Sequence, residues 1–68
     1  MTAEQFCQWL GTMKEAGRAA TDVECGATIG KTKISVLNYK ARGTDKTVAL
    51  ACQAALHGLP PYGESDDA

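Results

Sequence analysis

Five basic residues lie between positions 31 and 46 of this 68-residue chain, and their side chains are the ones best suited to bind a ligand. They are Lys31, Lys33, Lys40, Arg42 and Lys46. Only Asp45 opposes them there, so this segment carries +4, the rest of the chain −5 and the whole chain −1. Phosphates respond to the nearby field more than to the total charge, so the segment has the footprint of a nucleic-acid-binding surface. A solvated charged face is the alternative interpretation.

Polar side chains within the basic segment have the donors and acceptors needed to read DNA bases. Lys33 can donate to guanine O6 or N7, and Asn38 can make a paired donor and acceptor contact with adenine. Ser35 can contact either a base edge or a phosphate. Lysine and arginine beside these residues would contact phosphates, which position a protein without reading sequence.

The chain lacks the residue sets that catalysis requires. His57 is its single histidine, and no two carboxylates share an apolar setting. The stretch Gly-Ala-Thr-Ile-Gly-Lys-Thr over 26–32 is one residue short of the phosphate-loop spacing, and it follows a helical pattern instead of a strand. We therefore expect no enzymatic activity, no cofactor and no small-molecule ligand.

Three cysteines, Cys7, Cys25 and Cys52, form no Cys-x-x-Cys pair, and a zinc site needs four closely spaced ligands. Each cysteine falls where a helix face would take a small apolar residue. We expect three buried, reduced thiols and no metal site, and a redox role remains an open alternative.

Apolar periodicity and capping signals predict an all-α domain of four helices over residues 1–62, followed by a flexible acidic tail at 63–68. Thr2 and Gln5 form a capping-box pattern before the first helix, which ends at Gly17. Its apolar face is predicted to be Phe6, Trp9, Leu10 and Met13.

Two short helices joined by a tight turn are predicted over residues 21–43. Thr21 caps the first of them, with Glu24 placed to reach back, and its small buried face comes from Val23 or Cys25, Gly26 and Ile29. Gly30 supplies the turn, where a positive φ is required. Thr32 then caps a helix from Lys33 to about Arg42 that ends at Gly43, with Val36 and Tyr39 pointing inward.

A fourth helix begins at Thr44 or Asp45 and ends at Gly58, with Val48, Cys52, Ala55 and Leu56 along one stripe. Beyond it, we expect Leu59 and Tyr62 to fold back over Trp9.

Ile34 and Leu37 are the apolar residues with the least certain position. One is expected in the core, and the other is left open between the core, thymine methyl groups and a partner subunit.

The chain has no apolar run of about 18 residues, which excludes a membrane span. Its first residues also lack the basic start of a signal peptide. A cytoplasmic protein is expected.

The segment from residue 21 to 43 resembles the helix-turn-helix of the lambda-repressor-like, xenobiotic-response-element family of phage and bacterial regulators. The family pattern is Ser/Thr-x-x-Glu-apolar-Ala-x-x-apolar-Gly-x-Ser/Thr-x-x-x-Val-x-x-aromatic. The residues in register with it are Thr21, Glu24, Cys25, Gly26, Ile29, Gly30, Thr32, Val36 and Tyr39. Residues 47–52 and 58–62 also resemble the last helix and exit of short prophage-type members, so the likeness covers most of 2–62. Departures are glycine for alanine at Gly26, basic residues at Lys31 and Lys40, and a longer link between the first two helices.

The resemblance implies that Thr32, Lys33, Ile34 and Asn38 face the groove, with Ser35 beside them. The expected phosphate contacts are Lys31, Lys40, Arg42, Thr44 and Lys46. The expected function is a sequence-specific transcription regulator of phage or prophage type, with a repressor as the favoured form. It would bind double-stranded DNA as a homodimer, with the recognition helix at about 32–42 in the major groove.

The dimer contact is left open among Leu50, Leu59, Tyr62 and whichever of Ile34 and Leu37 lies outside the core. A protein-interaction module on the same scaffold is the alternative function, such as an antirepressor, an antitoxin or a DNA-packaging subunit.

Overall fold

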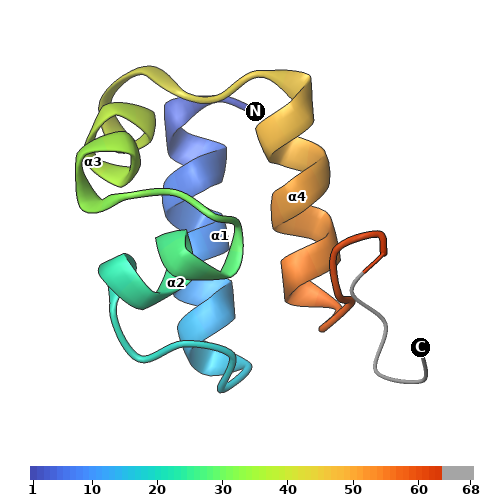
Figure 1. Cartoon of the computed structure of the whole chain (residues 1–68). Coiled ribbons are helices and arrows are strands. Elements are labelled where there is room, and N and C mark those ends of the chain that lie inside the picture. The colour runs from blue at the N-terminus through green and yellow to red at the C-terminus, as the bar shows by residue number, and fades with distance from the viewer. Residues whose placement is uncertain (64–68) are drawn as a thin grey trace.

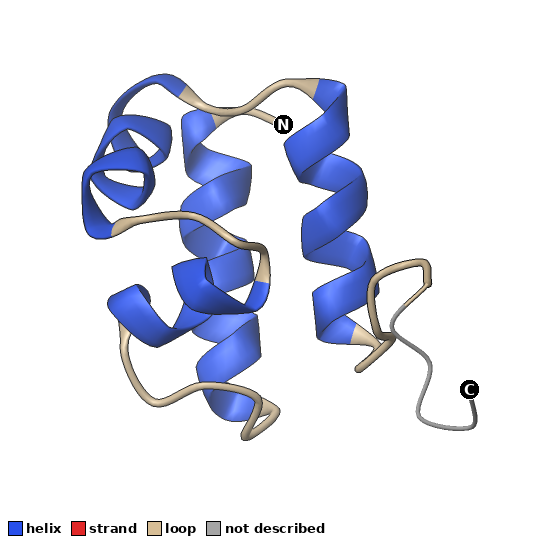
Figure 2. Cartoon of the chain, in the orientation of Figure 1, coloured by secondary structure: helices blue, strands red, loops and turns tan. Residues whose placement is uncertain are grey.

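The computed structural model of the protein describes residues 1–63, and this part of the chain contains four α-helices (Figure 1). They are α1 (Ala3–Glu15), α2 (Asp22–Thr28), α3 (Lys33–Arg42) and α4 (Lys46–Leu56). No strand occurs within 1–63 (Figure 2), which confirms the all-α prediction. Of the expected acidic tail, residues 64–68 lie outside the described part of the chain.

Each helix begins at a side-chain cap that satisfies backbone N–H groups left free in the first turn. The Thr2 hydroxyl accepts from the Gln5 N–H at 3.1 Å, and Gln5 Oε1 accepts from the Thr2 N–H at 2.9 Å, which completes the capping box. Thr21 and Thr32 cap α2 and α3 in the same way. Of the two candidates for α4, Asp45 is the cap, accepting from the Val48 N–H at 2.9 Å.

Glu24 reaches back one residue farther than expected. Its Oε1 accepts from the Ala20 N–H at 2.8 Å, in the link before α2, and not from the backbone of Thr21. The carboxylate therefore ties the end of the α1–α2 link to the first turn of α2.

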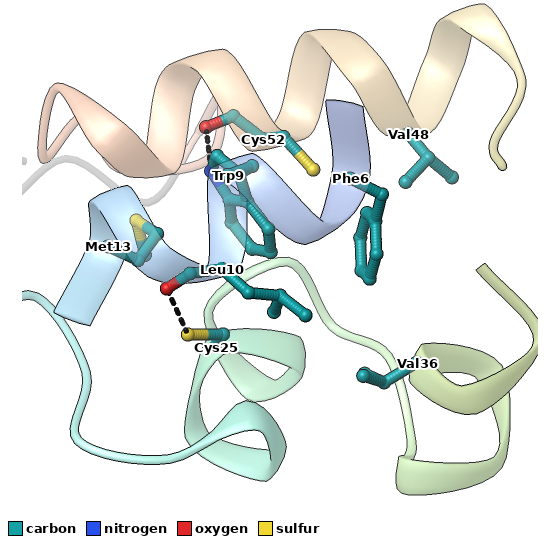
Figure 3. Close-up of a cluster of buried hydrophobic side chains, with 8 residues drawn as sticks. All are labelled: Phe6, Trp9, Leu10, Met13, Cys25, Val36, Val48 and Cys52. Carbon is teal, nitrogen blue, oxygen red and sulfur yellow. Dashed lines mark hydrogen bonds between the residues drawn. The ribbon is translucent and has the colours of Figure 1, made fainter. Parts of the chain in front are cut away.

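The hydrophobic core is built around α1, which contributes half of the buried residues and packs against the other three helices (Figure 3). The buried set is Phe6, Trp9, Leu10, Met13, Cys25, Val36, Val48 and Cys52. The Phe6 ring lies 5.4 Å from that of Trp9 and meets Tyr39 edge-on at 5.3 Å, between centroids. As a result, α2 and α3 lie on one side of α1 and α4 on the other (Figure 1).

Trp9 is buried by α4 itself, and not by the segment that follows α4. Its indole Nε1 donates to the Cys52 carbonyl at 2.9 Å (Figure 3), and the side chain is 6% exposed. Leu59 is 61% exposed and Tyr62 is fully exposed, so the expected cover over Trp9 is wrong. The Leu59 N–H donates to the Ala54 carbonyl at 3.0 Å, which holds the start of this segment at the end of α4.

The cysteines divide into two buried thiols and one exposed thiol, so the expectation of three buried ones is wrong for Cys7. Cys25 and Cys52 lie in the core, and burial raises the pKa of both thiols, to about 11 for Cys52. Cys7 follows Phe6 on α1 but lies outside the face that meets the other helices.

Across the same described residues, every helix is too short or too polar to cross a lipid bilayer.

Candidate nucleic-acid interface

A four-residue turn, 29–32, presents α3 from the end of α2. The Lys31 N–H donates to the Gly26 carbonyl at 2.9 Å, which closes the turn, and Gly30 has a φ of 73° that a residue with a Cβ rarely adopts. Gly26 is buried where α2 crosses α3, and a Cβ placed on it would collide with the Val36 side chain. The absence of a side chain at Gly26 therefore sets how closely the two helices approach.

Val36 and Tyr39 turn one face of α3 toward α1, as predicted. With about 3.6 residues per turn, the opposite face carries Ile34, Leu37 and Asn38. Ile34 is 72% exposed and Leu37 53% exposed, so neither side chain lies in the core and the expectation that one of them does is wrong. Their branched apolar side chains instead form part of the outward surface of α3.

The expected base-reading residues are brought together on the first two turns of α3, but with different freedom. Lys33, Ile34 and Asn38 are exposed, and the polar groups of Lys33 and Asn38 make no side-chain hydrogen bond within 1–63. The Thr32 hydroxyl is engaged as the helix cap, accepting from the Ser35 N–H at 3.4 Å. Ser35 is half-buried beside it, which leaves three of the five side chains free to meet a partner.

The expected phosphate-contacting residues also divide into free and engaged groups. Lys31, Arg42 and Lys46 are exposed and form no ion pair within the described residues. Thr44 is half-buried, its hydroxyl donates to the Asp45 carbonyl at 3.1 Å, and its N–H donates to the Met1 carbonyl at 2.7 Å. Thr44 therefore joins the α3–α4 link to the start of the chain and offers little to a phosphate.

Lys40 is held by an acidic partner that the sequence pattern did not reveal. Its ammonium lies 2.9 Å from Asp22 Oδ2, while Lys14 Nζ lies 2.5 Å from Oδ1 of the same carboxylate. Hydrogen bonds from Lys14 and then Lys40 lower the pKa of Asp22, and the bond to Asp22 raises the pKa of Lys14. Asp22 is 18 positions from Lys40, so no local spacing could have paired them.

A second surface feature is a cleft of about 400 Å³ between the α2–α3 turn and α4. Its lining is small and mostly apolar: Ala27, Thr28, Ile29, Gly30, Ala51, Ala54, Ala55, Leu59 and Pro61. None of these side chains can exchange a proton near neutral pH or act as an activated nucleophile. Within 1–63, no three His, Cys, Asp or Glu side chains are grouped closely enough to hold a metal ion.

Comparison with known proteins gives no relative from which a function could be transferred. A scan against protein-family models, a search of curated proteins and a search of solved structures each found no match.

Proposed function

We propose that this protein is a DNA-binding transcription regulator with a lambda-repressor-like helix-turn-helix fold. The observation that carries the proposal is the outward face of α3, a helix held on a four-residue turn and surrounded by exposed cations. Small proteins commonly insert such a helix in the major groove while nearby basic side chains contact the phosphates.

The proposed division of labour follows the freedom of each side chain. Lys33 and Asn38 read base edges from the exposed start and centre of α3. Lys31, Arg42 and Lys46 contact phosphates at either side of the groove. Lys40 contributes only when its ion pair with Asp22 opens.

A dimer on a two-fold site is part of the proposal, because one small module buries too little surface for tight, specific binding. A cytoplasmic phage or prophage repressor is the form we propose. Its dimer contact would use exposed apolar residues outside α3, among which Leu50 and Leu59 are large.

A protein-interaction module is the second candidate function. It is favoured by one observation, the exposure of Ile34 and Leu37 on the face that would otherwise meet DNA. Such a module would bind a helix or loop of another protein through these side chains and would bind DNA weakly.

The first prediction concerns binding to a pool of random DNA duplexes, measured by fluorescence anisotropy at two salt concentrations. Arg42→Ala should weaken binding to all sequences. The plot of the logarithm of the association constant against the logarithm of the salt concentration should become less steep by about one unit, because one phosphate contact is lost. Lys33→Ala or Asn38→Ala should cost about 1–3 kcal/mol on a selected site and relax the preference at one base pair.

Arg18→Ala is the matched control, since it removes one positive charge from the α1–α2 link, outside the proposed interface. It should change binding less than Arg42→Ala does. Intact DNA binding after charge reversal at both Lys33 and Arg42 would show that the outward face of α3 is not the DNA-binding surface.

A further inference from the structure

The outward face of α3 carries an apolar strip made of Ile34, Leu37 and Ala41. At about 3.6 residues per turn, the three positions share one side of the helix, away from the buried Val36. Ile34 is 72% exposed, Leu37 is more than half exposed and Ala41 is also exposed. Water contact with two large branched side chains on one ten-residue helix is unfavourable, and such a strip is typical of a binding surface.

Cations border the apolar strip on both of its sides. By helical position, Lys33 lies along one edge of the strip and Arg42 along the other. Both side chains are exposed, and neither forms an ion pair in the described part of the chain. A complementary partner must therefore present apolar groups between two rows of negative charge.

The major groove of DNA has this arrangement. It is about 12 Å wide, which admits a helix about 10–12 Å across, and phosphates run along both of its edges. The apolar groups on its floor are the C5-methyl groups of thymine. Asn38 lies beside the strip, and an amide there pairs with adenine, the partner base of thymine.

We propose that Ile34 and Leu37 contact thymine C5-methyl groups, so that the protein selects A·T base pairs under the first two turns of α3. This proposal rests on the proposed DNA binding and adds to it the chemical feature that is recognised. A protein partner with an apolar ridge and acidic edges is a different class of ligand, and the experiment below separates the two.

The test compares thymine with uracil, which differ only by the C5-methyl group. The duplex bound best by the full chain is selected from a random pool and remade with deoxyuridine in place of every thymidine. Loss of each buried methyl should weaken binding about fourfold. We therefore expect a loss of about fourfold to fifteenfold for one or two contacts.

Variants assign the effect to the apolar strip. In Ile34→Ala, the ratio of thymine to uracil affinity should fall by about fourfold, whereas the matched control Lys33→Ala should keep the ratio while binding both duplexes more weakly. Because Ile34 is exposed, its replacement should leave the helical circular dichroism unchanged, which verifies that the variant is folded.

The contrary outcomes separate the methyl contact from the proposed function. Salt-sensitive binding with equal affinity for both duplexes overturns the methyl contact and leaves the proposed function standing. An equal thymine preference in wild type, Ile34→Ala and Leu37→Ala also overturns it, because the methyl groups then act through DNA shape. A change of mass in sedimentation on Ile34→Ala, with an unaltered ratio, assigns the strip to a protein interface. Absence of salt-sensitive binding to the pool overturns the proposed function itself.

Discussion

Asp22 receives two lysines from different helices, Lys14 of α1 and Lys40 of α3, and it also begins α2. A carboxylate in the first turn is favoured by the partial positive charge of the helix N-terminus, so three positive influences meet at one side chain. The ion pair between Lys40 and Asp22 is partly exposed to solvent, so its contribution to the stability of the fold is modest. If the protein binds DNA as proposed, the same ion pair holds Lys40 away from a phosphate.

Replacing Asp22 should therefore change stability and DNA binding in opposite directions. Asp22→Asn is expected to cost about 0.5–1 kcal/mol of unfolding free energy at pH 7. It should also tighten non-specific DNA binding and steepen the salt slope by up to about one, because Lys40 becomes free. Urea unfolding and anisotropy titration measure the two effects.

The pH dependence follows from the direction of the pKa shift. Because folding lowers the pKa of Asp22 below 3.8, its stabilisation is complete above that value and is lost as the pH falls through the folded pKa. The stability difference between wild type and Asp22→Asn should therefore vanish in strong acid.

Glu15→Gln is the control, since it removes an exposed carboxylate that has no ion pair in the described residues. DNA binding that is no tighter in Asp22→Asn than in Glu15→Gln would show that Lys40 is not the cation released.

At the scale of helices, the approach of α2 to α3 depends on Gly26. The Cβ of an alanine there would collide with Val36 and lie 3.2 Å from the Lys31 carbonyl oxygen. A glycine inside a helix lowers helix stability by about 1 kcal/mol relative to alanine. At Gly26 this loss accompanies the close packing of α2 against α3. This crossing also fixes the direction in which α3 projects from the molecule.

Two matched glycine substitutions separate propensity from packing. Gly11→Ala, in α1 with nothing near its would-be Cβ, should stabilise the protein by about 0.5–1 kcal/mol. Gly26→Ala should destabilise it by about 1–2 kcal/mol, because overpacking outweighs the gain in propensity. Thermal or urea unfolding of each variant measures the difference.

The double variant Gly26→Ala/Val36→Ala should be less destabilised than the sum of its single changes, because the removed methyl groups make room for the new Cβ. Stabilisation of Gly26→Ala equal to that of Gly11→Ala would rule out a packing constraint at the crossing.

At the scale of the whole molecule, α1 is the helix to which the other three attach. On one side it receives α2 and α3, and on the other it holds α4 mainly through Trp9, Val48 and Cys52. The start of α4 has a further tie, because the backbone of Thr44, just before the helix, pairs with the backbone of Met1. Trp9 and Cys52, which hold α4, are buried, whereas the side chains on the outward face of α3 are exposed. Lys46, the first residue of α4, is the part of this helix that belongs to the proposed interface.

Removing the indole hydrogen bond should weaken the attachment of α4 without changing the proposed interface. Trp9→Phe is expected to lower the free energy of unfolding by about 1–3 kcal/mol, through the lost bond to the Cys52 carbonyl and the smaller ring. Below the unfolding transition, its DNA affinity should equal that of wild type. A loss of affinity in the folded variant would show that the packing of Trp9 against α4 positions Lys46, the first residue of α4, for its proposed phosphate contact.

The features that were predicted correctly from the sequence are local ones. Caps at Thr2, Thr21 and Thr32 depend on residues three positions apart, and the apolar stripe of α1 depends on helical periodicity, so both can be recognised without tertiary structure. The sequence left the cap of α4 open between Thr44 and Asp45, since threonine and aspartate are both common at this position. The structure identifies Asp45 as the cap.

Apart from the local bond of Glu24, which reaches Ala20 and not Thr21, the incorrect predictions concern which surfaces meet. The burial of Cys7, Ile34 and Leu37 depends on which neighbouring helix covers them, and all three are exposed. Leu59 and Tyr62 follow a turn, and helical periodicity does not predict the direction of the chain after a turn. The ion pair of Lys40 with Asp22 joins residues from two helices, so it requires the crossing angle as well as the sequence. Of the candidate interface, the position of α3 was predictable, but the freedom of each side chain on it was not.

The unequal burial of the three cysteines makes the protein its own indicator of folding. The thiolate is the form that reacts with an alkylating reagent, and Cys7 is the exposed one of the three cysteines. Cys25 and Cys52 are buried, and burial raises the pKa of both thiols. Native protein therefore takes one label per chain, and unfolded protein takes three, which intact-mass spectrometry resolves. The same exposed thiol accepts a fluorophore or spin label without any engineered residue, and it also requires a reducing agent wherever the native oligomeric state is measured.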